Sequence, residues 1–144
     1  MLFEALASFA GAASPSTWIK LPEFRNINMA TLLTRKDSDI LVVYFQDVSI
    51  IDEARITGLG DELLELIKTE NKKIVVNFEN VSFMSSAMIG KLIHFSTRCK
   101  EEKILIRLCN INENVMKVFT LMNLEKVFDI DADESDSVAK LKKI

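Results

Sequence analysis

Hydrophobic positions along this chain form short apolar runs that alternate with longer segments of helical spacing. The runs are rich in β-branched and aromatic residues, which favours strands, and most are apolar on every position, which is typical of strands buried on both faces. They cover residues 30–34, 40–45, 74–78, 104–108 and 127–130. A polar turn at residues 36–39 joins the first two runs, so these two predict a hairpin.

The segments between the later runs repeat their apolar residues every three or four positions, which predicts amphipathic helices. The first helix is predicted over residues 52–69, the second follows Ser86, and the third begins at residues 112–114 with Asn123 as its C-cap. An acidic turn at residues 131–136 leads into a final helix that ends in lysines, as suits a helix C-terminus.

The predicted element order is β-β-α-β-α-β-α-β-α. After the opening hairpin, strands alternate with helices, and this alternation requires a mostly parallel sheet with right-handed crossovers and helices on its faces. The sequence therefore predicts an α/β fold over residues 29–144, and its length suits one domain.

Residues 1–28 are predicted to be an extension that precedes this domain, because Pro15 and Pro22 interrupt any periodic pattern. Three large apolar residues of the extension, Trp18, Leu21 and Phe24, offer two alternatives. Either they pack on the domain or on a second copy, which would give a homodimer, or the extension is a mobile leader.

Composition and charge exclude several classes of partner. The net charge is −3 and the basic residues are scattered, so no basic stripe is available for nucleic acid or for an anionic membrane surface. No apolar run approaches the roughly 20 residues that span a bilayer. Residues 1–14 resemble a signal peptide only in part, because Glu4 stands where a basic residue belongs. We expect a cytoplasmic protein with two reduced, buried cysteines, Cys99 and Cys109.

The residues offer little catalytic chemistry. The single histidine, His94, shares the polar face of its helix with Lys91 and Arg98, so it is predicted to be a solvated surface residue. The pair Gly58 and Gly60 lacks the remaining features of a phosphate-binding loop. The acidic run at 129–136 lacks the central glycine and final glutamate of a calcium loop and is predicted to be a solvated turn. We expect no enzyme activity, no cofactor and no metal.

The most informative stretch lies between the strand at 74–78 and the second helix, where Ser85 and Ser86 stand together. One interpretation is structural, because a serine at the N-cap accepts a hydrogen bond from a free backbone N–H and contributes about 1 kcal/mol. The other is a phosphorylation switch, because a helix N-terminus tolerates negative charge. The two interpretations are compatible if the modified serine is exposed.

Residues 75–90 resemble the signature of the STAS family, the module of anti-sigma factor antagonists and of sulfate transporter tails. Phe83, Met84, Ser86 and Gly90 match the family pattern directly. Ile89 is a conservative match. Three positions depart from it: Ser85 replaces an aspartate, Ala87 a serine and Met88 a glycine. The resemblance extends from about Met29 to the C-terminus.

The resemblance implies a STAS fold and a non-enzymatic bacterial regulator. It implies an anti-sigma factor antagonist that binds an anti-sigma factor or a related serine kinase, with Ser86 as phosphoacceptor and Ser85 as cap or secondary site. Four side chains near the serines are expected to form the contact rim for the partner: Phe83, Met84, Met88 and Lys91. The alternative is a STAS scaffold that associates with other proteins without phosphorylation.

Overall fold

The computed structural model describes residues 32–144, which form a five-stranded sheet in the order β1-β2-β4-β6-β7. The strands are β1 (Leu33–Asp37), β2 (Ile40–Tyr44), β4 (Lys73–Asn77), β6 (Leu105–Cys109) and β7 (Ile130–Asp131). Only β1 is antiparallel to its neighbour, and every other pair is parallel. The predicted mostly parallel sheet is confirmed. The predicted extension at 1–28, with Trp18, Leu21 and Phe24, lies outside the described residues.

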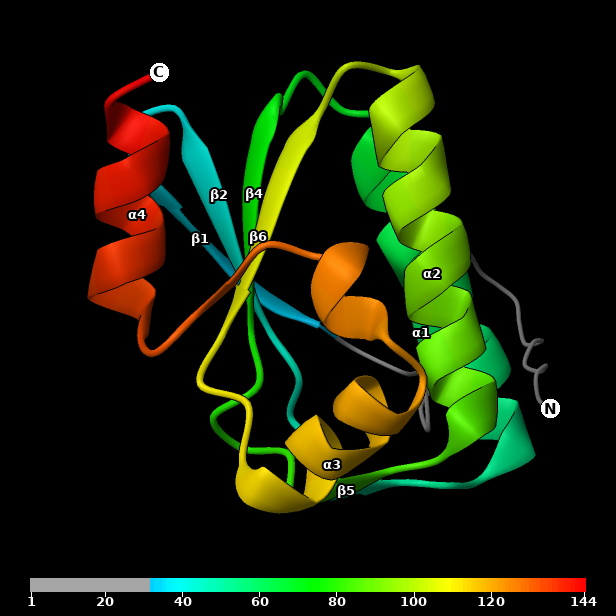
Figure 1. Ribbon diagram of the computed structural model, residues 1–144. Coiled ribbons are helices and arrows are strands. Elements are labelled where there is room, and N and C mark those ends of the chain that lie inside the picture. The colour runs from blue at the N-terminus through cyan, green and yellow to red at the C-terminus, as the bar shows by residue number, and fades with distance from the viewer. Residues whose placement is uncertain (1–31) are drawn as a thin grey trace, which may run out of the picture.

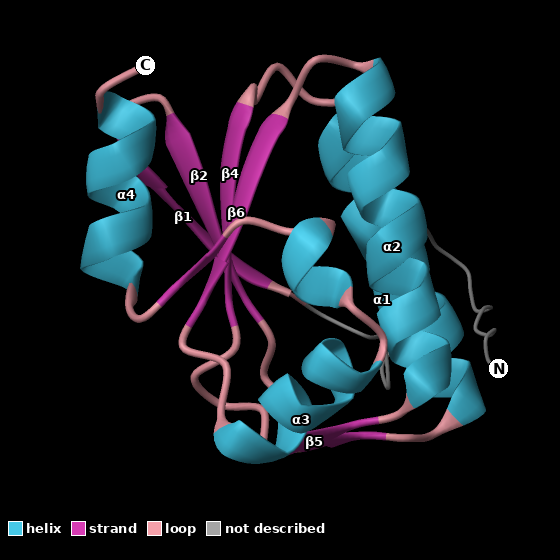
Figure 2. Cartoon of the chain, in the orientation of Figure 1, coloured by secondary structure: helices cyan, strands magenta, loops and turns pink. Residues whose placement is uncertain are grey.

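Helices cover both faces of this sheet (Figures 1 and 2). On one face lie α1 (Glu53–Ile67) and α2 (Ser86–Glu101), side by side, and on the other lies α4 (Glu134–Lys142). Near the carboxyl ends of the strands lie α3 (Glu113–Leu121), the 3-10 helix η2 (Leu124–Lys126) and a short parallel pair, β3 (Ser49–Ile50) with β5 (Phe83–Met84). Among residues 32–144, no helix is long and apolar enough to cross a membrane.

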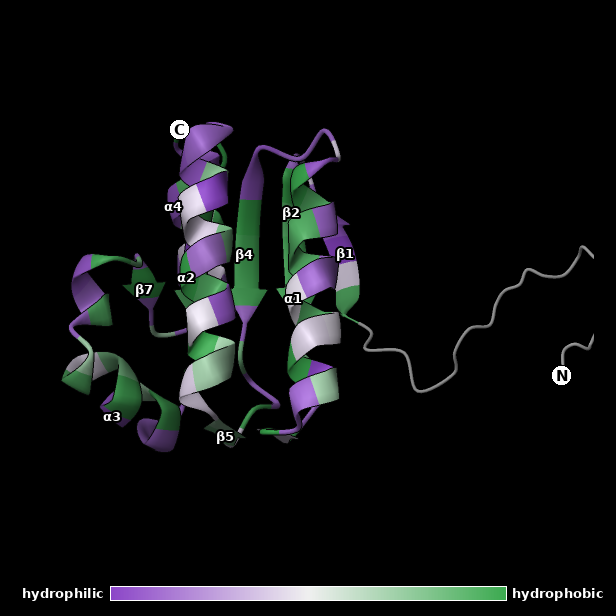
Figure 3. Ribbon diagram, turned by 90° about the vertical axis from the view of Figure 1, so that its right-hand side faces the viewer, coloured by the Kyte–Doolittle hydropathy of each residue, from purple (hydrophilic) through white to green (hydrophobic). Residues whose placement is uncertain are grey.

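The larger core fills the space between the sheet and the α1/α2 layer, to which the helices contribute buried residues such as Leu63 and Leu92. Figure 3 shows this helix layer in front of the sheet. Four phenylalanines extend this core from the strand ends toward α3 and η2. Their ring centroids are 5.2 Å apart for Phe45 and Phe78, 6.3 Å for Phe78 and Phe119, and 5.8 Å for Phe119 and Phe128. These contacts lie within the range of favourable aromatic pairs, so they tie the end of the sheet to the elements around it.

Two predicted strands are displaced in the structure. The first was expected at 30–34 with a turn at 36–39, but β1 extends to Asp37, and the chain reverses at Ser38, whose φ is 58°. The last was expected at 127–130, but Leu124–Lys126 form a 3-10 helix, and β7 starts at Ile130. The predicted first helix is confirmed, with Asp52 as its N-cap. Asn123 follows α3 in the left-handed conformation that suits a helix end.

The acidic run at 129–136 starts a helix and exposes Asp129, Asp133 and Asp136, as the sequence predicts, but the prediction of a solvated side chain is wrong for Asp131. The side chain of Asp131 is fully buried and accepts hydrogen bonds from Arg107 Nε, Ser137 Oγ and Lys140 Nζ, each at 2.6 Å. Burial alone would raise the pKa of Asp131, but these hydrogen bonds outweigh burial and hold the pKa well below its usual value. Asp133 caps α4 through Asp136 N, at 2.9 Å, as expected of an acidic helix start.

A second polar cluster holds the start of α4 to the sheet. The carboxylate of Glu134 accepts hydrogen bonds from Tyr44 OH at 2.5 Å, from Asn77 Nδ2 at 2.9 Å and from the guanidinium of Arg35. The apolar contact beneath α4 is small, because its core contains only six buried residues: Ile40, Val42, Val75, Cys109, Val138 and Leu141. The position of α4 therefore depends strongly on its polar contacts.

We expect Asp131→Asn to lower the free energy of unfolding by about 2–3 kcal/mol at neutral pH, because two cations lose their buried partner. Urea unfolding followed by circular dichroism measures this change. Asp129→Asn is the matched control, because the Asp129 side chain is 72% exposed, and its loss should cost less than about 0.5 kcal/mol.

The same pair of proteins should show a pH dependence. The pKa of Asp131 is lower in the folded state than the unfolded value of about 3.9, so its contribution to stability is complete above that value and falls as the pH drops toward the folded pKa. The difference between wild type and Asp131→Asn should therefore shrink below about pH 4. A difference that stayed constant down to pH 2.5 would contradict this assignment.

Candidate functional site

The serine pair lies in a loop that the small β3–β5 pair holds against the start of α1. Ser82 N and Phe83 N both donate to the Val48 carbonyl, at 2.7 and 3.2 Å, and Ser85 N donates to the Ile50 carbonyl at 3.0 Å. These bonds fix the backbone on both sides of Phe83. The sequence reasoning missed this pair, although the β-branched run at residues 48–51 was a signal for a short strand.

Three asparagine side chains fasten the same loop to the ends of the main sheet. Asn77 Oδ1 accepts a hydrogen bond from Glu79 N at 2.7 Å, and Asn80 Nδ2 donates to the Phe45 carbonyl at 3.1 Å. Asn112 Nδ2, at the start of α3, donates to the Ser82 carbonyl at 3.1 Å. The loop thus has a defined conformation on the residues below it.

The two serines have different positions in α2. Ser85 is the N-cap, with extended backbone angles, and its Oγ accepts a hydrogen bond from Met88 N at 3.4 Å. Ser86 is the first residue of the helix and is exposed. The first turn of α2 contains no acidic residue, so the positive end of the helix dipole is not already compensated there. The capping interpretation therefore applies to Ser85, and the accessible hydroxyl is that of Ser86.

The contact rim expected from the sequence is only partly at the surface. Phe83 is 50% exposed, but Met84 and Met88 are 2% and 0% exposed and belong to the main core. Met84 is buried because alternate residues of β5 point to opposite sides, and Met88 because it lies on the inner face of α2. We therefore correct the rim: these two methionines support the loop from below and do not form surface.

Two apolar residues that sequence reasoning did not select are exposed on the segment that pairs with β5. Val48 is 61% exposed and Ile51 is 58% exposed, and β3 with its flanking residues brings both next to β5. We call Val48, Ile51 and Phe83 the docking patch. Exposed apolar residues that gather in one place are a feature of interaction sites, whereas scattered ones need no explanation.

Lys91 is half-buried and packs across α1. A Cβ on Gly60 would lie 2.8 Å from Lys91 Cδ, so the lysine stem occupies the space above this glycine, and the absence of a side chain lets α1 and α2 approach closely. The pair Gly58 and Gly60 therefore lies inside a helix and forms no phosphate loop. Gly90 differs, because a Cβ there would meet nothing within 4 Å. Packing within the domain does not require a glycine at this position.

The remaining chemistry-bearing residues are distant from this loop or unreactive. His94 is exposed, as predicted. Cys99 and Cys109 are buried free thiols, as predicted, and burial raises the pKa of each to about 12, so neither is a thiolate near neutral pH. Within residues 32–144, no three side chains of the metal-ligating types come together as a metal site.

Fold and site together define an α/β module that presents a serine-bearing loop at the carboxyl ends of its parallel strands. The chain belongs to the STAS domain family, whose model matches residues 31–137. STAS domains are typically non-catalytic regulatory modules.

Solved structures of anti-sigma factor antagonists share this fold. SpoIIAA in its unphosphorylated form is 19% identical, with a TM-score of 0.66, over 79% of this chain and 98% of that one. An antagonist from Mycobacterium paratuberculosis is 16% identical, with a TM-score of 0.69, over 78% and 93%. RsbS from Moorella thermoacetica, in a variant form, is 20% identical, with a TM-score of 0.66, over 78% and 95%. At these identities, the likeness establishes the fold.

We expect the two serines to respond differently to replacement by alanine. Ser85→Ala removes the cap of α2 and should lower the free energy of unfolding by about 1 kcal/mol, whereas Ser86→Ala should change it by less than about 0.5 kcal/mol. Ser85→Asp should restore the lost stability, because aspartate caps helices well. Urea unfolding of the three variants checks this, and equal losses for both alanine variants would contradict the assignment of the cap.

Proposed function

We propose that this protein is an anti-sigma factor antagonist that binds an anti-sigma factor of the serine-kinase type through the docking patch and is controlled by phosphorylation of Ser86. The observation that carries this proposal is the juxtaposition of an exposed serine on the first turn of α2 with an exposed apolar patch on the adjoining β3–β5 pair. A modification at the serine would then act directly on a surface that a partner covers.

Charge and desolvation explain how the switch would operate. A phosphate on Ser86 carries nearly two negative charges at neutral pH, and the N-terminus of α2 favours negative charge, so the domain itself stays folded. A partner that covers Phe83 would have to remove water from this phosphate, which costs free energy unless the partner supplies cations. Phosphorylation is therefore expected to release the partner without unfolding the domain. SpoIIAA, which shares the fold, has been solved in a phosphorylated form as well as an unphosphorylated one.

Gly90 supports a docking surface that continues along α2. A glycine inside a helix costs about 1 kcal/mol relative to alanine, yet nothing within the domain occupies the space beside it. A partner that approaches the backbone closely at this point would account for the glycine. Ala87, one turn earlier, is also exposed and small. Both residues lie next to Ser86 on the helix, so the proposed contact includes the first two turns of α2.

The first test is intact-mass spectrometry, with site mapping, of the protein purified from its native cells. We expect a fraction with one added phosphate on Ser86 and none in Ser86→Ala expressed in the same cells. Phosphate on Ser85 alone would show that the cap is the acceptor and would contradict the assignment of Ser86. Its absence under every growth condition would favour the scaffold alternative.

The second test concerns binding. The Ser86→Ala protein serves as bait in the native cells, and the dissociation constant of the captured partner is then measured for each variant. Ser86→Asp and Phe83→Ala should each weaken binding by at least about tenfold, as expected at the centre of an interface. Leu121→Ala is the matched control, because Leu121 is 83% exposed on α3 and lies outside the docking patch. Equal affinities for all variants would overturn the docking patch.

Two substitutions at Gly90 are expected to act on different properties: one raises stability and the other weakens binding. Gly90→Ala should raise the free energy of unfolding by up to about 1 kcal/mol, because the new methyl group meets no obstacle in the domain. Gly90→Leu should weaken binding to the same partner by about tenfold or more, because the larger side chain occupies the space of the partner. Unchanged binding of Gly90→Leu would remove α2 beyond its first turn from the proposed contact.

The alternative function is a scaffold that associates constitutively. Its supporting observation is Ser85, which replaces the aspartate of the family pattern and is already engaged as a helix cap. In this case the docking patch would still bind a partner, so Phe83→Ala would weaken binding, whereas Ser86→Asp would leave the affinity unchanged. The two variants together therefore separate the switch from the scaffold.

A further inference from the structure

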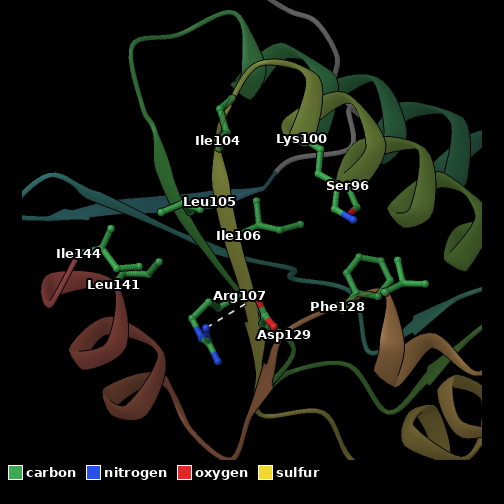
Figure 4. Close-up of a pocket in the computed structure, with 11 residues that line it drawn as sticks. Ser96, Lys100, Ile104, Leu105, Ile106, Arg107, Phe128, Asp129, Leu141 and Ile144 are labelled. Atoms are coloured by element: carbon green, nitrogen blue, oxygen red, sulfur yellow. Dashed lines mark ion pairs between the residues drawn. The ribbon is translucent and has the colours of Figure 1, made fainter.

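The outer edge of β6 is only partly covered in the structure. β7 pairs with Leu108 and Cys109 alone, so the preceding residues 105–107 have no strand beside them on this side within the described part of the chain. A cavity of about 160 Å³ lies along this uncovered stretch, between the C-terminal half of α2 and the end of α4 (Figure 4). An open strand edge of this kind is a template for pairing with another strand.

The direction of the backbone groups shows what the edge offers. Leu105 N donates inward to the Lys72 carbonyl at 2.8 Å, and Leu108 N donates outward to the Asp129 carbonyl at 2.9 Å. Backbone groups alternate along a strand, so both the N–H and the C=O of Ile106 point outward at the uncovered edge. One residue thus presents a donor and an acceptor side by side, which is the arrangement that a hydrogen-bonded pair in an antiparallel ladder requires.

The walls of the cavity are apolar on both faces of the sheet. Ile106 and Phe128 line the side of α2, and Leu105, Leu141 and Ile144 line the side of α4 (Figure 4). Leu105 is 42% exposed and Ile144 is 71% exposed. A strand placed on this edge would therefore bury apolar side chains on both of its faces, so its own sequence has to be apolar at consecutive positions. The segment 104–106, Ile-Leu-Ile, meets this requirement.

Charged side chains lie at both ends of the cavity. Lys100 lies at the end near Ile104, and Asp129 lies at the opposite end beside Arg107, whose Nη1 is 3.8 Å away (Figure 4). The Asp129 side chain is 72% exposed. The edge is thus complementary to itself in its backbone groups and in its apolar faces.

We propose that a second copy of this chain occupies the edge, with β6 paired antiparallel to β6 around a twofold axis at Ile106. The two Ile106 residues would exchange both backbone hydrogen bonds, and Leu105 of each copy would lie opposite Arg107 of the other. The docking patch lies beyond the opposite, carboxyl ends of the strands (Figure 1), so the dimer leaves it free. This proposal does not depend on the proposed function.

Sedimentation velocity of the full chain over a series of concentrations tests the dimer. Wild type should sediment as a monomer–dimer equilibrium. Leu105→Lys should raise the dissociation constant by at least about tenfold, because it puts a cation at the edge where Leu105 would face the other copy's Arg107. Leu121→Lys, on α3, is the matched control and should leave the constant unchanged. Ser86→Asp should also leave it unchanged, so failure of the switch and failure of the dimer are distinguishable.

Amide hydrogen exchange provides a readout at the edge itself. Exchange of the Ile106 amide should slow as the protein concentration rises, whereas that of Leu105, which is already bonded to Lys72, should not depend on concentration. The proposal is overturned if the chain is monomeric at every concentration, if a dimer forms that Leu105→Lys does not weaken, or if the Ile106 amide exchanges at the same rate at all concentrations.

Discussion

The buried central strand β4 is the constraint on which the rest of the structure depends. It lies between β2 and β6, it is parallel to both, and its residues from Ile74 to Asn77 are at most 2% exposed. Because the three strands run in one direction, their carboxyl ends lie at the same end of the sheet. The loop with the serine pair follows β4 and therefore leaves the sheet at this end. The rings of Phe45, Phe78 and Phe119 pack against one another near the point where this loop leaves the sheet.

In the proposed switch, one short loop divides stability and regulation between two neighbouring serines. The hydroxyl of Ser85 caps α2 within the domain. Ser86, one residue later, is exposed and is not the cap. A regulatory group at the second position costs the domain little, since the helix already favours negative charge there. The docking patch lies on the β3–β5 pair, which side chains other than those of the two serines hold in place. Under the proposed function, the affinity of this patch for a partner can therefore change while the fold remains the same.

Much of this arrangement could be predicted from the sequence, because apolar periodicity reports burial directly. The buried runs of β2, β4 and β6 and the helix at α1 follow from that pattern. The pattern did not predict burial at positions where contacts between elements distant in sequence determine it. Met88 reads as a surface residue in a family motif, but the phase of α2 turns it into the core. Asp131 reads as a solvated acid, but Arg107, far away in sequence, makes its burial favourable.

The docking patch was the other feature beyond the reach of the sequence. Val48 and Ile51 are 35 and 32 residues before Phe83, and only the two-residue pairing of β3 with β5 brings them together. Strands this short have no periodicity of their own, so local patterns cannot specify their partner. The predicted rim was therefore restricted to residues close to the serines in sequence, and two of these proved to be core.

The unequal way in which the two faces of the sheet are covered has a consequence for the behaviour of the domain in different solvents. The α1/α2 face is held by a broad apolar core, whose strength varies mainly with temperature. The α4 face combines a small apolar contact with ion pairs such as Arg35–Glu134 and Lys142–Asp37, which salt and acid weaken. High ionic strength should thus weaken the attachment of α4 more than that of α1 and α2. The C-terminal helix is therefore the part of this domain whose attachment the ionic environment controls.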